Sequence, residues 1–161
     1  MTQKQIDERW MREALALAAK AAEQGEIPVG AVIVKDGKLL CGAYNLRHRQ
    51  KSVSAHAELL AIEEACRLTG DWRLSGCTLY VTLEPCPMCA GAIVNGRIER
   101  LVYGVKDPAA GCCGSVLNLN AYPFPHAFSW TGGVCEEECR TILREFFERK
   151  RQAVRLVAEQ S

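Results

Sequence analysis

The amino-acid sequence predicts a three-layer α/β/α domain built around a central, mixed, five-stranded sheet. Segments with helical periodicity alternate with short segments rich in β-branched residues, which is typical of a sheet covered by helices on both faces. Asp36-Gly37 lies between two β segments and predicts an antiparallel hairpin, so the sheet is mixed. The 161 residues contain no linker, repeat or low-complexity segment, and we expect a single domain over residues 1–161.

Capping residues mark the predicted helices. Thr2 and Gln5 form a capping box at the start of the first helix. Ser54 is the expected N-cap of a second helix, which ends before Gly70. Pro87 suits the first position of a third helix, because its missing N–H would be unpaired there in any case. The predicted helices cover residues 3–24, 54–69, 87–95 and about 135–158.

Strands are predicted where β-branched and aromatic residues cluster or alternate with polar ones. The segment from Cys77 to Leu83 alternates along its length and leads directly into a proline and cysteine motif. Residues 45–53 and 106–126 are rich in polar and turn residues, and we expect loops there. The predicted strands cover residues 29–34, 38–44, 77–83, 100–105 and 127–131.

Composition excludes several classes of protein. The formal net charge of +1 gives no global indication of a nucleic-acid-binding protein. No apolar segment is long enough for a membrane helix, and the N-terminus lacks the apolar core of a signal peptide. Nine cysteines, an odd number, indicate free thiols in a reducing cytoplasm. Positive charge gathers in the last predicted helix, at Arg140, Arg144, Arg149, Lys150, Arg151 and Arg155.

Two short motifs indicate the chemistry of the chain. His56-Ala57-Glu58 lies near the start of the second predicted helix, and Pro85-Cys86-Pro87-Met88-Cys89 lies at the start of the third. The histidine and the two cysteines supply three zinc ligands, which leaves one position of a tetrahedral site open for water. The glutamate is not needed as a ligand and is placed to transfer protons. Such a site is typical of catalytic zinc, which activates water for attack on an electron-poor carbon. The predicted zinc ligands are His56, Cys86 and Cys89, and the predicted catalytic residue is Glu58.

A structural zinc site is the alternative. It would need a fourth protein ligand, for which the sequence offers Cys41, Cys66, Cys112 or Cys113. None of these belongs to a second Cys-x-x-Cys motif, and the adjacent pair 112–113 has poor geometry for one tetrahedral ion. The sequence therefore favours a catalytic site.

The chain resembles the cytidine and nucleotide deaminase superfamily and, within it, the bacterial tRNA adenosine deaminases. The zinc motifs are specific to the superfamily only. The closer resemblance rests on further stretches between residues 5 and 150, namely residues 27–32, 44–45, 82–92, 107–111 and 146–147.

This resemblance implies a cytidine-deaminase-like fold and the hydrolytic deamination of adenosine to inosine at the wobble position of a tRNA anticodon loop. It also implies one Zn²⁺ per subunit, a homodimer and a tRNA anticodon stem-loop as partner. Asn45 would contact the flipped purine, Asp107 the ribose–phosphate face, and Phe146 with the following arginines the flanking nucleotides. The substrate-binding residues implied in this way are Asn45, Ala57, Asp107, Phe146 and Arg149.

Most of these contact residues also have a plainer interpretation. Asn45 suits the end of a strand, and Asp107 suits the start of a turn. Phe146 and Phe147 lie on different faces of a helix, so at least one of them is expected in the core. The basic run around Arg149 is also compatible with a solvated helix face.

Two other functions stay open. The first is a small-molecule guanine or cytosine deaminase of the same superfamily, although such an enzyme has no use for a basic terminal helix. The second is a non-catalytic, zinc-stabilised RNA-binding module. Glu58 argues against the second, because a binding module needs no group that transfers protons.

Overall fold

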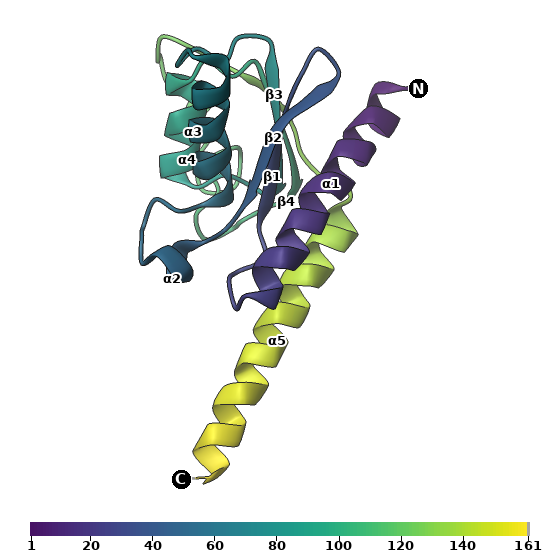
Figure 1. Ribbon diagram of the computed structural model, residues 1–161, viewed down its shortest axis with the longest axis vertical. Coiled ribbons are helices and arrows are strands. Elements are labelled where there is room, and N and C mark those ends of the chain that lie inside the picture. Colours follow the sequence, from purple (N-terminus) through teal and green to yellow (C-terminus); the bar gives the residue numbers. More distant parts are fainter. Residues whose placement is uncertain (161) are drawn as a thin grey trace.

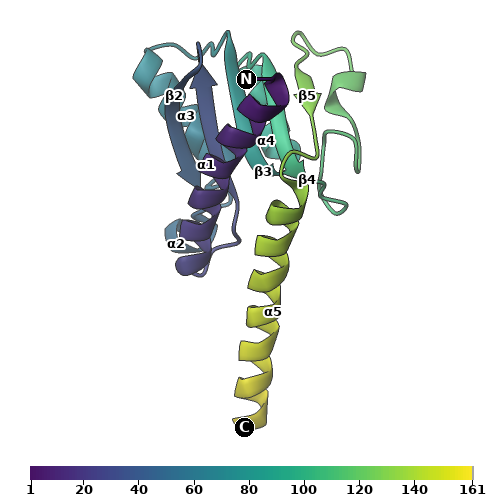
Figure 2. The same cartoon turned by 90° about the vertical axis from the view of Figure 1, so that its right-hand side faces the viewer.

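A computed structural model describes residues 1–160 and shows one sheet between two layers of helices (Figures 1 and 2). The helices are α1 (Gln3–Glu23), α2 (Arg47–Gln50), α3 (Ala57–Thr69), α4 (Pro87–Asn95) and α5 (Glu136–Gln160), with the short 3-10 helix η1 (Leu119–Ala121). The strands are β1 (Gly30–Lys35), β2 (Lys38–Tyr44), β3 (Cys77–Leu83), β4 (Arg100–Val105) and β5 (Ser129–Thr131). The predicted α/β/α fold with a mixed sheet is confirmed.

The order of the strands decides where a site can form. The sheet runs β2-β1-β3-β4-β5. β1 is antiparallel to both of its neighbours, whereas β3, β4 and β5 are parallel to one another. Ala31 near the start of β1 pairs with Val81 near the end of β3. The start of β1 and the carboxyl ends of β3 and β4 therefore meet at one edge of the sheet.

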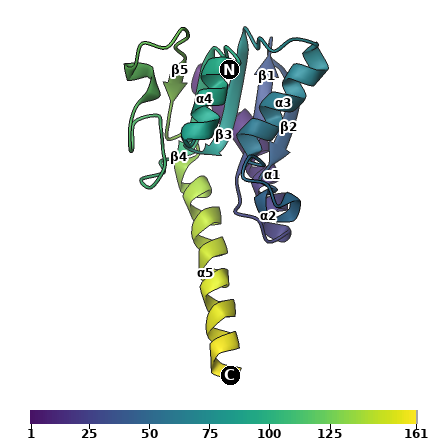
Figure 3. The same ribbon diagram turned by 90° about the vertical axis from the view of Figure 1, so that its left-hand side faces the viewer.

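Helices α3 and α4 cover one face of the sheet, and α1 and the first turns of α5 cover the other (Figures 1 and 3). α1 lies very close to β1, because a Cβ atom added to Gly30 would come within 2.0 Å of the carbonyl oxygen of Ala14. An ion pair also holds α1 to the sheet, since Arg100 donates to the Asp7 carboxylate at 2.8 and 2.7 Å. Each face has its own apolar core.

Three local predictions need correction. α3 begins at Ala57 with His56 as its N-cap, not at Ser54, whose hydroxyl pairs with that of Ser52. The expected loop at 45–53 contains the helical turn α2. The fifth strand starts at Ser129, two positions later than expected. Within residues 1–160, no helix is both long and apolar enough to cross a membrane.

Helix α5 is much longer than the sheet needs. Its first turns pack beside β4 and α1, and the rest extends away from the sheet (Figure 2). Apolar side chains on this distal part are largely exposed, namely Val154, Leu156 and Val157.

Candidate functional site

Two helix N-termini bring the predicted metal ligands together. His56 is the N-cap residue of α3, and Cys86 is the N-cap residue of α4. Neither side chain makes the usual capping hydrogen bond to its own helix, so both are free to point across the gap between the helices. Cys89 lies in the first turn of α4. The positive ends of the helix dipoles favour thiolate over thiol at the two cysteines.

The distances between these side chains fit a tetrahedral metal site. Nδ1 of His56 lies 3.6 Å from Sγ of Cys86 and 3.7 Å from Sγ of Cys89. Zinc bonds of about 2.0 Å to nitrogen and 2.3 Å to sulfur place such ligand atoms about 3.6 Å apart. Within residues 1–160, this is the only group of three such side chains with their ligand atoms all within 4.8 Å of one another. The four cysteines considered as a fourth ligand lie outside it, so one tetrahedral position stays open.

The three candidate ligand side chains shift one another's pKa values. The contact with Cys89, together with that of His56, lowers the pKa of Cys86 to about 4. The neighbouring Cys86 sulfur and burial raise the pKa of Cys89, and the contact with Cys86 raises the pKa of His56. One thiolate is therefore present at neutral pH. A divalent cation bound here would displace the remaining proton, because a coordinating thiol is deprotonated.

Glu58 lies beside this group and is buried, with 4% of its surface exposed. Burial raises the pKa of its carboxyl to about 7, and the nearby Cys86 thiolate acts in the same direction. A cation held by the three ligands would lower this pKa again. A carboxyl that titrates near neutral pH can both accept and donate a proton, which is the property that a general base and general acid needs.

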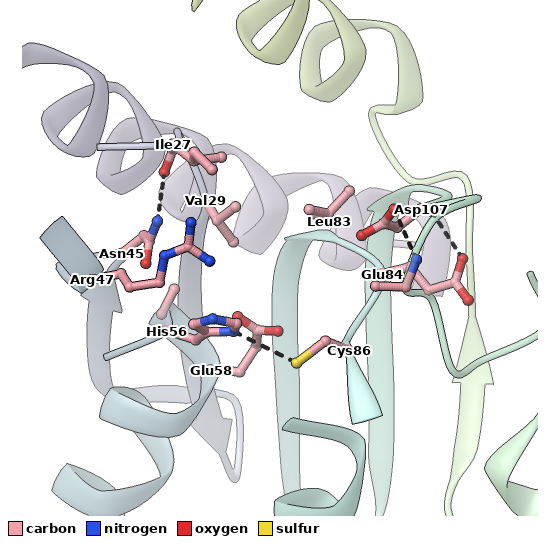
Figure 4. Close-up of a pocket in the computed structure, with 12 residues that line it drawn as sticks. Ile27, Val29, Asn45, Arg47, His56, Glu58, Leu83, Glu84, Cys86 and Asp107 are labelled. Carbon is pink, nitrogen blue, oxygen red and sulfur yellow. Dashed lines mark hydrogen bonds between the residues drawn. The ribbon is translucent and has the colours of Figure 1, made fainter. Parts of the chain in front are cut away.

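A pocket opens above the metal ligands and Glu58 (Figure 4). It encloses about 210 Å³ at the edge of the sheet where β1 and β3 meet. Three of the predicted substrate-binding residues line it, namely Asn45, Ala57 and Asp107. Apolar walls come from Ile27, Val29, Leu83 and Ala110.

Asn45 has an unused hydrogen-bond acceptor at this pocket. Its side chain is buried, and Nδ2 donates to the carbonyl oxygen of Ile27 at 3.3 Å. Oδ1 has no partner among residues 1–160. A buried polar atom without a partner costs about 1–3 kcal/mol, and a bound ligand that offers an N–H or O–H would recover this cost. The orphaned oxygen is therefore available to a ligand that donates a hydrogen bond.

Glu84, which was not predicted from the sequence, stabilises the wall of the pocket opposite Asn45. Glu84 is 1% exposed and accepts hydrogen bonds from the amides of Asp107, Cys113 and Ser115 at 3.1, 2.9 and 3.2 Å, and from the Ser115 hydroxyl at 2.5 Å. Burial acts to raise the pKa of Glu84, but these four hydrogen bonds outweigh it and lower the pKa. The end of β3 is thereby tied to the loop that carries Asp107.

The other two predicted contact residues lie on α5 and do not line this pocket. Phe146 is 4% exposed and packs edge-on against Phe147, whose side chain is 42% exposed. Arg149 lies on the exposed part of the helix. The prediction also missed Arg47, which lines the pocket from α2. The only signal for it was the basic cluster of residues 47–51.

Comparisons with known proteins agree with this site. The family described as MafB19-like deaminase matches residues 6–151. The tRNA-specific adenosine deaminase of Bacillus subtilis is 50% identical over 147 residues, which is 91% of each chain. A structure solved in a study of A-to-I editing by tRNA:A34 deaminases has a TM-score of 0.82 and 43% identity, and covers 84% of this chain and 99% of its own. A guanine deaminase structure from Bacillus subtilis has a TM-score of 0.60 and 38% identity, and covers 66% of both chains.

The fold and the site therefore define a deaminase of the cytidine-deaminase-like class. Within that class, this chain is more similar in sequence to the tRNA-specific enzyme than to the guanine deaminase, and the match to the tRNA-specific enzyme covers more of both chains. The chain belongs to the family of tRNA-specific adenosine deaminases.

Proposed function

We propose that this protein converts adenosine to inosine at the wobble position of a tRNA anticodon loop, as a cytoplasmic homodimer with one Zn²⁺ per subunit. One arrangement supports this most directly. A three-ligand metal centre and a buried proton-transfer group lie below a pocket with an orphaned acceptor, in a chain that is 50% identical to a tRNA-specific adenosine deaminase.

His56, Cys86 and Cys89 would hold the zinc, which when bound acts as a Lewis acid and lowers the pKa of a coordinated water to roughly 7. Glu58 accepts a proton from the attacking water and delivers it to a ring nitrogen of adenine. The same carboxyl then takes the second proton, from the hydroxyl that has been added to the ring carbon, and gives it to the departing amine. The net reaction consumes one water and releases ammonia, so the buried Glu58 returns to its starting state.

The pocket suits a single base. Its volume of about 210 Å³ lies below the roughly 300–1,000 Å³ of pockets that enclose drug-sized ligands. The sugar and phosphate therefore stay outside, and the base must be turned out of its stack to enter. A base in an anticodon loop is already partly unstacked, which keeps this cost low. Oδ1 of Asn45 would accept a hydrogen bond from the base, and Ala57 and Asp107 would line its edges.

The nucleotides around the target would lie along α5. Arg149 and its basic neighbours offer positive charge to phosphates. Phe147 carries an exposed ring beside Lys150 and Arg151, and Phe146 supports this ring through the edge-on contact of 5.4 Å between ring centres. A flanking base could stack on such a ring.

The outer surfaces of α3 and α4 would form the homodimer. Leu59, Met88 and Ala92 are only half-buried there, and the space beside Gly91 is open to 4 Å. These small and apolar residues would let the helices of a second copy approach closely. Sedimentation velocity of the purified protein would test the dimer, which a monomeric species at micromolar concentration would contradict.

The decisive experiment measures deamination of an anticodon stem-loop that carries adenosine at the wobble position, with free adenosine, cytidine and guanine as parallel substrates. Inosine should form in the stem-loop far faster than any free compound reacts. Faster deamination of guanine or cytidine would assign the protein to the small-molecule branch. Stem-loop binding without ammonia release would indicate a binding module.

A further inference from the structure

Arg47 is the one basic side chain other than His56 among the residues that line the pocket. Its guanidinium lies above His56 and next to Asn45 (Figure 4). Within residues 1–160, this guanidinium has neither a hydrogen bond nor an ion pair. The acidic groups of the lining are the carboxyls of Glu58, Glu84 and Asp107 and the thiol of Cys86. A free cation at an otherwise acidic pocket indicates an anionic part of the ligand.

A buried carboxylate fixes the position of Arg47. Glu26 is 0% exposed, and its two oxygens accept from the amides of His48 at 3.1 Å and Arg49 at 2.7 Å. Both amides belong to α2, the helical turn that starts with Arg47. Because a buried charge is costly without such partners, Glu26 strongly disfavours any displacement of α2.

The neighbouring arginine is held in a different direction. Nη1 of Arg49 donates to Oε1 of Gln24 at 2.7 Å, and Gln24 in turn donates to the hydroxyl of Tyr44. Arg49 does not line the pocket. The chain therefore offers two exposed arginines on one helical turn, of which only Arg47 faces the reaction site.

We propose that Arg47 binds the phosphate next to the target nucleotide at the mouth of the pocket, and that Glu26 is the positioning residue that holds it there. This inference rests on the proposed function. A pocket of base size leaves the phosphate at its mouth, and a guanidinium suits a phosphate because it donates two parallel hydrogen bonds. The contact makes the site prefer a nucleotide within an RNA strand over a free nucleoside.

The test compares three stem-loops. One is unmodified, and the others carry an uncharged methylphosphonate in place of the phosphate on the 5′ or the 3′ side of the target adenosine. For the wild type, one of the two replacements should lower kcat/KM about 10- to 100-fold, the value of a hydrogen bond to a charged group. For Arg47→Ala, the unmodified stem-loop should show a loss of the same size, and the methylphosphonate should cause little further loss.

Arg49→Ala is the matched control, since it removes the same charge two positions away. It should respond to the methylphosphonates as the wild type does. Arg47→Lys keeps the charge but not the paired donors, and should recover only part of the loss.

The role of Glu26 is tested by Glu26→Gln, alone and combined with Arg47→Ala. The amide –NH2 group would face one of the two α2 amides, and two donors repel each other. Glu26→Gln should therefore lower kcat/KM for the stem-loop with zinc content unchanged. If it acts through Arg47, the double variant should be no worse than Arg47→Ala alone.

The outcomes separate the two proposals. A wild type that does not deaminate the unmodified stem-loop would overturn the proposed function and this inference with it. A wild type that is active, with equal methylphosphonate losses in Arg47→Ala and in the wild type, would overturn the inference alone. Additive losses in the double variant would remove Glu26 from the proposal and leave the phosphate contact. The same holds if Glu26→Gln is unstable while Arg47→Ala no longer responds to the methylphosphonates.

Discussion

Nδ1 of His56 and Sγ of Cys86 lie 3.6 Å apart although 30 positions separate them in the sequence. Each is the N-cap residue of its helix, and neither caps that helix with its side chain. The fold therefore brings two helix starts together as the two halves of one candidate metal site. A group of three ligand side chains within residues 1–160, with Glu58 adjacent, fits the catalytic interpretation better than a closed structural site.

The purified protein should contain one zinc per chain, bound by His56, Cys86 and Cys89 and one water. Cys86→Ser should lose most of the zinc, because it removes a thiolate from the only such cluster within residues 1–160. Metal analysis and X-ray absorption of the zinc edge measure the stoichiometry and the ligands. Cys66 lies outside the cluster, so Cys66→Ser should keep the metal. A shell of four protein ligands with a third sulfur would contradict the catalytic site.

Glu58→Ala should fold, retain zinc and lose deamination by about 10²–10⁴-fold or more, because the one buried proton-transfer group is gone. Single-turnover rates on the anticodon stem-loop, together with the zinc content, check this. Glu63→Ala is a control on the same helix, since Glu63 is exposed. A zinc-loaded Glu58→Ala protein with near wild-type rate would refute the mechanism. Loss of zinc together with activity would make Glu58 a ligand.

The sequence predicted those parts of the fold and site that depend on local patterns. Capping at Thr2, the Asp36-Gly37 hairpin and the helix start at Pro87 all follow from short-range chemistry, and the structure contains each of them. The Cys-x-x-Cys spacing belongs to the same class, since both cysteines lie in one turn.

The parts that the sequence did not predict depend on distant contacts. α2 has no periodicity of its own, and its amides are held by Glu26, more than twenty positions earlier. Arg47 faces the pocket for that reason, so no local pattern identifies it. Likewise, adjacent Phe146 and Phe147 could not be told apart as buried and exposed until the packing of α5 was known.

Asp7→Asn should lower the free energy of unfolding by about 3 kcal/mol, because it leaves the Arg100 guanidinium without its anion. This loss is at the low end of the range for breaking a buried ion pair, because the side chain of Arg100 is 22% exposed and so partly solvated. Urea denaturation at neutral pH measures it. Glu8→Gln, which loses only the long, exposed contacts to Lys4 and Arg12, should cost less than about 1 kcal/mol.

The same pair predicts a pH dependence of stability. Burial acts to raise the pKa of Asp7, but hydrogen bonds from Arg100, Gln3 and Tyr80 outweigh it and lower the pKa. The stabilisation is therefore complete above the unfolded value of about 3.9 and is lost as the pH falls through the lower, folded value. The difference between wild type and Asp7→Asn should be constant from pH 7 to about pH 5 and should shrink below about pH 4. A difference that disappears already near pH 6 would contradict this assignment.

Glu84→Gln should weaken substrate binding more than the chemical step. Both carboxylate oxygens of Glu84 accept from N–H groups, so an amide –NH2 must face at least one donor and loosen the loop of Asp107. We expect KM for the stem-loop to rise with kcat and zinc content nearly unchanged. Ser115→Ala removes only the hydroxyl donor and should cost about 1 kcal/mol or less. A fall in kcat without a change in KM would instead place Glu84 at the metal centre, beside Cys86.

Binding of the stem-loop should depend steeply on salt, because α5 gathers positive charge on a chain whose net charge is only +1. If about four of its cations contact phosphates, the slope of log affinity against log salt is near −3 for single-stranded RNA. A fourfold rise in salt should then weaken binding by roughly 50-fold. Fluorescence anisotropy of a labelled stem-loop at several salt concentrations measures the slope.

Replacement of Arg149, Lys150 and Arg151 by alanine should flatten this slope by about 2 and raise KM, with zinc content unchanged. The matched control replaces Lys4, Lys35 and Lys38, which are also exposed. They belong to the first turn of α1 and to the β1–β2 hairpin, which lie at the end of the molecule away from the tail of α5 (Figure 1). Both triple variants remove three positive charges. If the slope flattens equally in both, the salt dependence reflects the net charge of the protein and not contacts along α5. A slope that flattens only in the α5 variant would place the RNA backbone along that helix. Salt-independent binding by the wild type would leave the small-molecule branch as the better assignment.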